Sequence, residues 1–159
     1  MSERQSRTAP SDILTLLVKG GFVTPTLRRI IEGFAKKWDL SPFHALLITE
    51  VMPENDLADA LATLCSVDRL FHVVSLGVDE EALKIIGFKR AREWECIALK
   101  TEDGMLDLVF ADPTRSERTA QLKQELKREL TLAVAERSDI VRAIDELYPL
   151  SSQLPGLFT

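Results

Sequence analysis

The sequence predicts an α+β protein in which amino-terminal helical hairpins precede a small three-stranded sheet covered by helices. Three observations support this fold class. Apolar residues recur at helical spacing through the first part of the chain, behind residues that start helices. Two β-prone runs then flank Asp103 and Gly104, which is a strong hairpin signal. A third β-prone run, Leu130–Ala135, lies between two helical segments, so strands and helices alternate in the second part.

Four helices are predicted in the first part, and each follows a residue or junction that favours a helix start. The starts are Asp12, Thr24–Pro25, Ser41–Pro42 and the Pro53–Asp56 junction. Gly20 and Gly21 end the first helix, because glycine readily takes the left-handed cap conformation. The clearest amphipathic stripe belongs to the second helix and comprises Leu27, Ile30, Ile31, Phe34 and Ala35.

The first part also contains a weak internal repeat. Leu16–Leu27 resembles Leu46–Leu57 if one residue is allowed to slip, and each copy is a short helix, a hydrophobic turn and a longer helix. Hairpins repeated about 30 residues apart suggest two stacked units that bury a shared face. Two amphipathic hairpins could also resemble each other by chance, and the sequence leaves that alternative open.

The second part alternates between predicted strands and helices. An edge strand is expected at Phe71–Val74, followed by a helix that Asp79 starts and Gly87 stops. Lys89–Trp94 predicts a further helical turn. The remaining elements, in order, are strands at Cys96–Lys100 and Met105–Ala111, a helix from Pro113 to Arg128, a strand at Leu130–Ala135 and a helix from Ser138 to Tyr148.

These patterns divide the chain into four predicted segments. They are a flexible tail at residues 1–10, a helical subdomain at 11–68, an α+β subdomain at 69–148, and a linker or tail at 149–159. The last segment combines proline, serine and glycine with apolar residues such as Leu157 and Phe158. Such an apolar end favours a fragment of a longer chain, or a tail that docks on a neighbour.

Composition and charge argue against several functional classes. Hydrophobic residues make up 45% and charged residues 28%, which are ordinary values for a soluble globular protein. The net charge of -5 argues against binding a nucleic-acid polymer through its phosphates. No apolar run is long enough to span a bilayer. We therefore predict a cytoplasmic protein without direct membrane insertion. Cys65 and Cys96 fit this compartment as free thiols.

The sequence lacks the common motifs for catalysis and cofactor binding. The phosphate-cradling GxxxxGK[ST] loop is missing, and so are GxSxG, HExxH and GxGxxG. His44 and His72 are the only histidines, so a zinc site would have to recruit carboxylates as well. We therefore predict a non-enzymatic domain with no catalytic, cofactor-binding or metal-binding residues.

An ordered set of short patterns resembles a known bacterial family. Asp79–Ile86 is followed by Cys96–Leu99, by Asp103–Pro113 with its Ala-Asp-Pro ending, and by Val134–Tyr148. This order is similar to the amino-terminal domain of type II secretion and type IV pilus assembly ATPases. In that family a helix with an acidic start precedes a hairpin, and "ADP" ends the second strand. The helical repeat resembles the module that binds cyclic di-GMP in some members, so the resemblance covers roughly residues 12–148.

The nucleotide-binding version of this module has polar positions that the chain lacks. It resembles Arg-Leu-Gly, then pairs of aliphatic residues around a turn glycine, then Leu, Leu and Gln on the next helix. The second repeat keeps the aliphatic residues but has Ser41–Phe43 at Arg-Leu-Gly, Glu50 at the glycine and Leu64 at the glutamine. The first repeat keeps Gly21 but has Asp12–Leu14 at Arg-Leu-Gly.

These missing positions argue against cyclic di-GMP as a partner. A dianionic dinucleotide needs cations or forked donors, and the nearest arginines, Arg28 and Arg29, lie on the wrong helix. The positions that match are apolar and would serve a core equally well. If the module has a ligand or partner surface, the matching residues that would form it are Gly21, Phe22, Phe43, Leu46, Leu47, Leu57 and Leu61.

The resemblance implies a docking domain that tethers a larger enzyme. In secretion ATPases such a domain attaches to the cytoplasmic part of an inner-membrane protein. The resemblance therefore implies a protein partner of that kind, and a location peripheral to the inner membrane through this partner. The alternatives are a regulatory domain that senses cyclic di-GMP and a regulatory extension of a membrane glycosyltransferase. An exposed apolar docking surface could include Phe22, Trp38, Phe43 and Phe71, although core packing would explain each of them.

Overall fold

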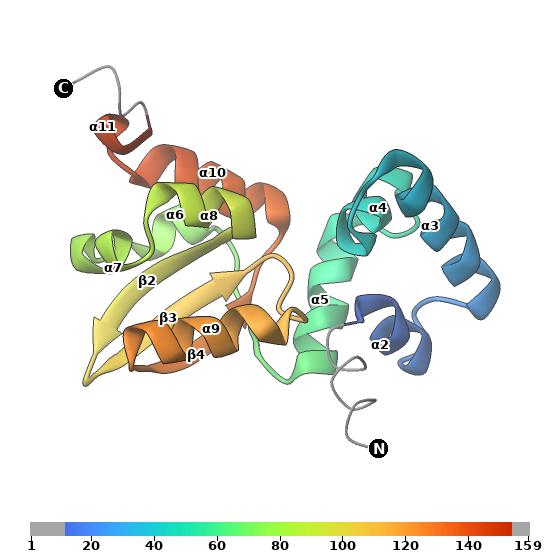
Figure 1. Ribbon diagram of the computed structural model, residues 1–159, viewed down its shortest axis with the longest axis horizontal. Helices are drawn as coiled ribbons and strands as arrows, with labels where there is room; N and C mark the ends of the chain where they lie inside the picture. The colour runs from blue at the N-terminus through green and yellow to red at the C-terminus, as the bar shows by residue number, and fades with distance from the viewer. Residues whose placement is uncertain (1–11, 154–159) are drawn as a thin grey trace.

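A computed structural model describes residues 12–153. Figure 1 shows two parts, with helices α2 to α5 on one side and a sheet with its own helices on the other. The tail predicted for residues 1–10 lies outside the described residues, and so do residues 154–159. The predicted α+β class is confirmed. Within residues 12–153, no helix has both the length and the apolar character needed to cross a membrane.

The first part consists of four helices that begin where the sequence predicts. They are α2 (Ile13–Lys19), α3 (Pro25–Trp38), α4 (Pro42–Thr49) and α5 (Glu54–Cys65). The side chains of Asp12, Thr24 and Ser41 accept hydrogen bonds from backbone N–H groups in the first turns of α2, α3 and α4. These caps satisfy donors that a helix start leaves without an intrahelical partner. The order is short helix, long helix, short helix, long helix, which agrees with the predicted repeat.

The turns of the two repeats share an unusual backbone conformation. Gly21 has φ of 82° and Glu50, at the corresponding position, has φ of 53°. Both values lie in the left-handed region, which glycine enters freely and other residues enter at a cost. The second repeat therefore keeps the turn geometry of a glycine position although glutamate occupies it.

The second part is a four-stranded sheet with helices on both sides. Its elements are β1 (Asp68–Arg69), α6 (Val73–Leu76), α7 (Glu80–Ile85), α8 (Phe88–Trp94), β2 (Cys96–Glu102), β3 (Met105–Phe110), α9 (Ser116–Leu126), β4 (Glu129–Val134), α10 (Arg137–Leu147) and α11 (Leu150–Gln153). The strand order is β1-β4-β3-β2, in which β2 and β3 form the predicted hairpin and the other pairs are parallel. Figure 1 shows α9 on one side of the sheet and α8 with α10 on the other.

The prediction of three strands is wrong, because the segment joining the two parts supplies a fourth. Asp68 and Arg69 pair in parallel with Ala133 and Val134 of β4. A two-residue strand carries no alternating pattern, so the sequence could not reveal it. The predicted subdomain boundaries stay a prediction. In the segment predicted as a linker or tail, the described residues include the short helix α11.

The predicted edge strand at Phe71–Val74 is also wrong. His72 has φ of 51°, which interrupts an extended run, and Val73 begins α6. The carboxylate of Asp139 in α10 accepts hydrogen bonds from the Val73 backbone N–H at 3.1 and 3.2 Å. A residue distant in sequence therefore caps this short helix. The local pattern of apolar residues contains no information about such a contact, so it could not predict the helix.

One continuous core joins the two parts. Its buried apolar side chains come from every helix of the first part, from strands β2, β3 and β4, and from α10, and they include Leu17, Leu61, Leu108 and Ile140. Cys96 lies in this core, where burial raises the pKa of its thiol to about 12. Cys65 is half-buried, and both thiols are free, as predicted.

Candidate functional site

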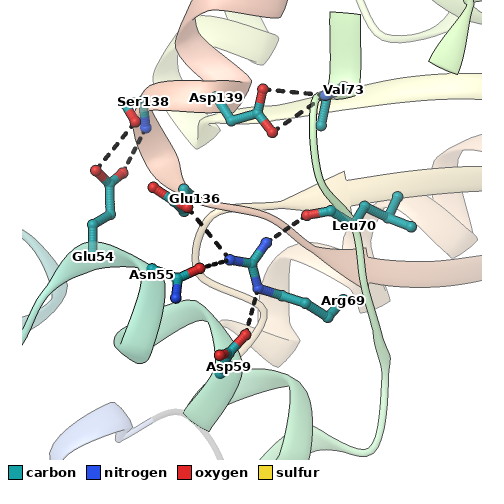
Figure 2. A network of polar contacts seen from close by, with 9 residues as sticks. All are labelled: Glu54, Asn55, Asp59, Arg69, Leu70, Val73, Glu136, Ser138 and Asp139. Carbon is teal, nitrogen blue, oxygen red and sulfur yellow. Dashed lines mark hydrogen bonds and ion pairs between the residues drawn. The ribbon is translucent and has the colours of Figure 1, made fainter. Parts of the chain in front are cut away.

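An arginine at the end of β1 connects the two parts of the molecule. Figure 2 shows the Arg69 guanidinium group pointing into a ring of acceptors. It donates to Asp59 at 2.8 Å and Asn55 at 2.6 Å on α5, to the Leu70 carbonyl at 2.5 Å, and to Glu136 at 3.4 Å, just before α10. Only 11% of the Arg69 side chain is exposed. We call these five residues the Arg69 network.

The Arg69 network follows from local geometry on both sides. Asn55 and Asp59 are four residues apart on α5, so their side chains emerge from the same face of the helix. The pairing of β1 with β4 brings Arg69 beside the start of α10, because the chain passes from β4 directly into that helix. A guanidinium group presents five donors in a rigid fork, which suits this planar set of acceptors.

Helix α10 is held by a second contact from the helical part. Glu136, at its N-cap, makes no capping hydrogen bond with its side chain. The carboxylate of Glu54 on α5 accepts instead from the Ser138 backbone N–H at 2.6 Å and from the Ser138 hydroxyl at 3.1 Å (Figure 2). A negative charge is favoured at a helix N-terminus because unpaired N–H groups and the helix dipole both point there. Glu54 of the first part therefore caps helix α10 of the second part.

Glu95 forms a third link between the parts. Its carboxylate lies 2.9 Å from His44 Nε2 on α4 and 2.5 Å from Arg137 Nε on α10. The other ring nitrogen of His44 lies 2.7 Å from the Ser41 hydroxyl. Burial alone would raise the pKa of Glu95, but the hydrogen bonds and charges of His44 and Arg137 outweigh it and hold that pKa below its usual value.

Two hollows border these contacts. The first, which we call the junction pocket, has a volume of about 450 Å³ and is lined by Leu47, Glu50, Met52, Pro53, Glu54, Arg137 and Ser138. The second, the turn pocket, has a volume of about 320 Å³ and is lined by Phe22, Met52, Asp56, Asp59, Ala60 and Thr63. Met52 borders both pockets, and Asp59 belongs to both the turn pocket and the Arg69 network.

The turn pocket brings together corresponding parts of the two repeats. Phe22 directly follows the left-handed Gly21 of the first turn, and Met52 lies two residues after the left-handed Glu50 of the second. Phe22 is 44% exposed, so its ring is available to a ligand. Asp56 and Asp59 give the pocket a negative charge, and no cationic side chain lines it. The hollow therefore offers apolar and stacking contacts rather than a phosphate grip.

The structure separates the seven residues predicted as a ligand or partner surface. Four of them are buried in the core and cannot form a surface here: Phe43, Leu46, Leu57 and Leu61. These apolar positions lie on the inward face of amphipathic helices. They serve the core, which was the alternative explanation given for them. The other three reach solvent: Gly21, Phe22 and Leu47. Phe22 lines the turn pocket and Leu47 the junction pocket, and a ligand contact by either one stays a prediction.

Arg28, one of the two arginines nearest the first hairpin, is engaged in contacts within the helical part. Arg28 donates to Asp12 at 2.6 Å, to Thr15 at 2.9 Å and to Glu32 at 3.0 Å. These contacts join α3 to the cap of α2 and occupy the guanidinium group. Arg28 therefore has a structural role, and it does not line the turn pocket.

Sequence reasoning missed Arg69, Glu95 and Arg137. Each makes its contacts with residues far along the chain, and none belongs to a motif. Across residues 12–153, no three His, Cys, Asp or Glu side chains gather in a way that could hold a metal ion.

Comparisons with known proteins identify the family and the fold. A family model, the MshEN domain, matches residues 75–154. The fold is similar to a structure of MshE with cdg, with a TM-score of 0.68, 19% identity and coverage of 86% of this chain and 99% of that chain. It is also similar to the N-terminal domain of XpsE, with a TM-score of 0.67, 18% identity and coverage of 86% and 94%. A search of curated proteins finds no match.

The MshE structure corrects one expectation. We took the missing arginine and glutamine positions as reason to reject cyclic di-GMP as a partner, and a protein of the same fold is solved with cdg, which is cyclic di-GMP. A mismatch in one motif is therefore insufficient to exclude this ligand. The resemblance to the amino-terminal domains of secretion and pilus-assembly ATPases is confirmed, and with the match spanning just over half of its length, the chain belongs to the MshEN domain family.

Proposed function

We propose that this chain is a regulatory domain that binds cyclic di-GMP at the turn pocket. The observation that carries the proposal is the fold shared with the MshE structure solved with cdg, which the alignment covers over 99% of its length. The proposed role is binding and signalling, in the cytoplasm and beside a larger enzyme, rather than catalysis by the domain itself.

The repeat supports a ligand with internal symmetry. Cyclic di-GMP consists of two identical guanosine monophosphate halves, and the two hairpins present corresponding turns at one hollow. Phe22 and Met52 come from those turns and offer an aromatic face and a polarisable thioether. Purine bases stack on aromatic rings with about 1–3 kcal/mol per base. A guanine on Phe22 is therefore the contact that we expect to contribute most.

The charge of the turn pocket sets the expected affinity. Asp56 and Asp59 repel the phosphates of the ligand, and the pocket has no arginine to offset them. We expect binding in the micromolar range, and we expect added salt to strengthen it by screening the repulsion. This salt dependence is opposite in sign to that of a site built on arginines.

Calorimetric titration of the whole chain with cyclic di-GMP tests the proposal. Phe22→Ala should weaken binding about tenfold, which is the loss of one stacking contact of roughly 1.4 kcal/mol. Trp38→Ala is the control, because Trp38 is an exposed aromatic residue that does not line the turn pocket. GMP alone should bind far more weakly, since it engages one turn only. A folded protein that shows no saturable heat would remove cyclic di-GMP from this site.

A charge variant sharpens the same test. Asp56 is exposed and lines the turn pocket, so Asp56→Asn should tighten binding by about threefold through reduced repulsion. Glu93→Gln removes one negative charge from α8, where the side chain is exposed, and should leave the affinity unchanged. Equal effects from both variants would indicate a response to net charge rather than a ligand in the turn pocket.

The contacts of Asp59 suggest how binding would be transmitted. Asp59 lines the turn pocket and accepts from Arg69, which holds Glu136 at the start of α10. A ligand that moves the Asp59 carboxylate would weaken one side of the Arg69 network and change how the two parts are held. A ligand shifts the equilibrium between two arrangements of the Arg69 network only if it binds one arrangement more tightly than the other.

A docking domain is a second candidate function. It is favoured by the large apolar side chains that α3 leaves exposed, among them Trp38. A docking surface and a cyclic di-GMP site are compatible in one regulatory domain, provided that they occupy separate surfaces.

A further inference from the structure

A separate hollow lies at the end of α10, where this helix meets α7, α8 and α11. We call it the α10 groove. Its volume is about 460 Å³, and its apolar lining consists of Leu83, Phe88, Leu147 and Pro149. Phe88 and Leu147 are half-buried and Pro149 is exposed, so apolar surface in the groove reaches solvent. In Figure 1, α11 and this end of α10 lie on the side away from helices α2 to α5.

Tyr148 gives the groove a fixed wall. Its side chain is buried, and its hydroxyl donates a hydrogen bond to the Ile86 carbonyl. Its ring meets the Phe88 ring edge-on, with 5.8 Å between the centroids, which is a favourable aromatic geometry. The groove is therefore largely preformed, as is typical of binding sites.

The charges around the groove do not favour an ionic occupant. The charged residues that line it are Glu80 and Lys84, which are both exposed and lie one turn apart on α7. Their charges offset each other. The apolar lining therefore decides what the groove binds, and it fits aliphatic and aromatic side chains.

Helix α11 brings the chain back to the α10 groove. The side-chain amide of Gln153 donates to the Asp145 carbonyl at 3.0 Å and to the Tyr148 carbonyl at 2.7 Å. The last carbonyls of a helix have no intrahelical partner, so this amide caps the end of α10. Ser152 lines the groove, and α11 packs against α8. The described part of the chain therefore ends at the border of the groove.

The next residues, 154–159, lie outside the described residues, and their sequence suits this groove. Leu154, Leu157 and Phe158 are apolar, and Pro155 and Gly156 stand between them. Proline followed by glycine at the two central positions is typical of a type II β-turn, which reverses the chain. The sequence therefore predicts that Leu157 and Phe158 turn back toward α10. Five extended residues span at most about 17 Å, which is enough to reach along a groove that begins beside α11.

We propose that the segment Leu154–Phe158 binds in the α10 groove, with the Leu157 and Phe158 side chains against Phe88 and Leu147. Removing two large apolar side chains from water favours this arrangement. The segment is joined to the chain at the border of the groove, so its effective concentration there exceeds that of a separate peptide in solution. The occupant is therefore this chain's own segment rather than a partner's.

The proposal gives α10 a contact at each end. Glu54 and Arg69 hold its start from the rest of the molecule, and the bound segment holds its end. The proposal goes beyond cyclic di-GMP binding and is independent of it, because no residue lines both the α10 groove and the turn pocket. Ligand binding without contacts of the segment, or the reverse, would therefore show which of the two proposals fails.

Nuclear magnetic resonance on the whole chain tests the proposal. With labelled leucine methyl groups and phenylalanine rings, nuclear Overhauser effects should connect the Leu157 methyl groups to the Phe88 ring. Their absence in the folded parent chain would overturn the proposal. In a mixture of labelled and unlabelled chains, effects that arise only between two molecules would overturn it in favour of a second copy as the source of the segment.

A groove-filling variant and a matched control complete the experiment. Gly87 lines the groove with φ of -66°, and a carbon added there meets no atom within 4 Å, so Gly87→Leu should fill the groove without backbone strain. It should abolish the effects between Leu157 and Phe88. Gly33→Leu adds the same side chain to open space on α3 and should leave them unchanged. Effects that persist in Gly87→Leu, or that disappear equally in both variants, would overturn the proposal.

Discussion

The two parts of this chain differ in how their similarity to known proteins is detected. The MshEN family model matches residues 75–154, almost entirely the sheet and its helices. The structural similarity extends much further, over 86–93% of the chain, and so includes helices of the first part. The sheet part is thus recognised from both its sequence and its fold. In the helical part, turn geometry and apolar positions are kept while the polar positions of the motif have changed.

This difference shows what a missing motif can exclude. The left-handed turn survives at Glu50 even though its glycine is gone. Both the continuous apolar core and the polar contacts join the two parts.

The largest expected effects come from core truncations in each part. Leu108→Ala in β3 and Leu61→Ala in α5 should each lower the free energy of unfolding by about 3 kcal/mol, because both side chains are fully buried. Trp38 lies in α3 and Trp94 in α8, so single-tryptophan variants report the two parts separately. If the parts form one cooperative unit, urea unfolding gives the same midpoint with both reporters. A lower midpoint only for Trp38 in the Leu61→Ala variant would show two independent units.

A smaller loss is expected at the connection itself. Arg69→Ala removes the donors to Asp59, Asn55, Glu136 and the Leu70 carbonyl, and should cost about 2 kcal/mol because it leaves partly buried acceptors without a partner. It should also separate the unfolding midpoints reported by Trp38 and Trp94.

Two further arginine variants define the cause of that loss. Arg69→Lys keeps the charge but not the fork, so it should recover part of the stability. Arg142→Ala is the matched control, since within the described residues this exposed arginine has no ion pair or hydrogen bond. Coincident midpoints in Arg69→Ala would mean that the apolar core alone couples the two parts.

The sequence predicted the helices and strands far better than the contacts between them. Caps at Asp12, Thr24 and Ser41 and the hairpin at Asp103 and Gly104 involve neighbours in the chain, so local residue types are enough to identify them. The errors lie at β1 and at Phe71–Val74, where pairing with β4 and capping by α10 override local preference.

The candidate site was the least predictable feature. Arg69 reaches Glu136 across 67 residues, and Glu95 reaches His44 across 51. Charged residues at such separations look like ordinary solvated surface until the fold brings them together. The aliphatic positions of the repeat were visible in the sequence, but periodicity alone could not distinguish the buried Leu61 from the half-buried Leu47.

The link through Glu95 should make the connection sensitive to acid. The pKa of Glu95 is held below its usual value of 4.5, so its contribution is present above that pH and is lost as the pH falls through the lowered pKa. At pH 7, Glu95→Gln should therefore be less stable than the parent chain by about 1–2 kcal/mol, through weakened hydrogen bonds to His44 and Arg137.

Thermal unfolding between pH 7 and pH 3 checks both parts of that expectation. The gap between the parent chain and Glu95→Gln should narrow as the pH falls below 4.5, because the parent carboxylate becomes protonated. Glu93→Gln, which changes an exposed neighbour on α8, should follow the parent at every pH. A constant gap across this range would show that the charge of Glu95 does not connect the parts.

The smallest effects are expected at the two left-handed turns, and they have opposite signs. Gly21→Ala should cost about 1 kcal/mol, because a φ of 82° suits glycine, while no neighbour lies within 4 Å of the added carbon. Glu50→Gly should stabilise by about 0.5 kcal/mol by relieving a left-handed glutamate. Glu50→Ala removes most of the side chain but keeps a non-glycine residue at this positive φ. It therefore separates the contribution of the side chain from that of the backbone conformation. Chemical denaturation measures all three, and a loss of stability in Glu50→Gly would mean that the Glu50 side chain stabilises the turn.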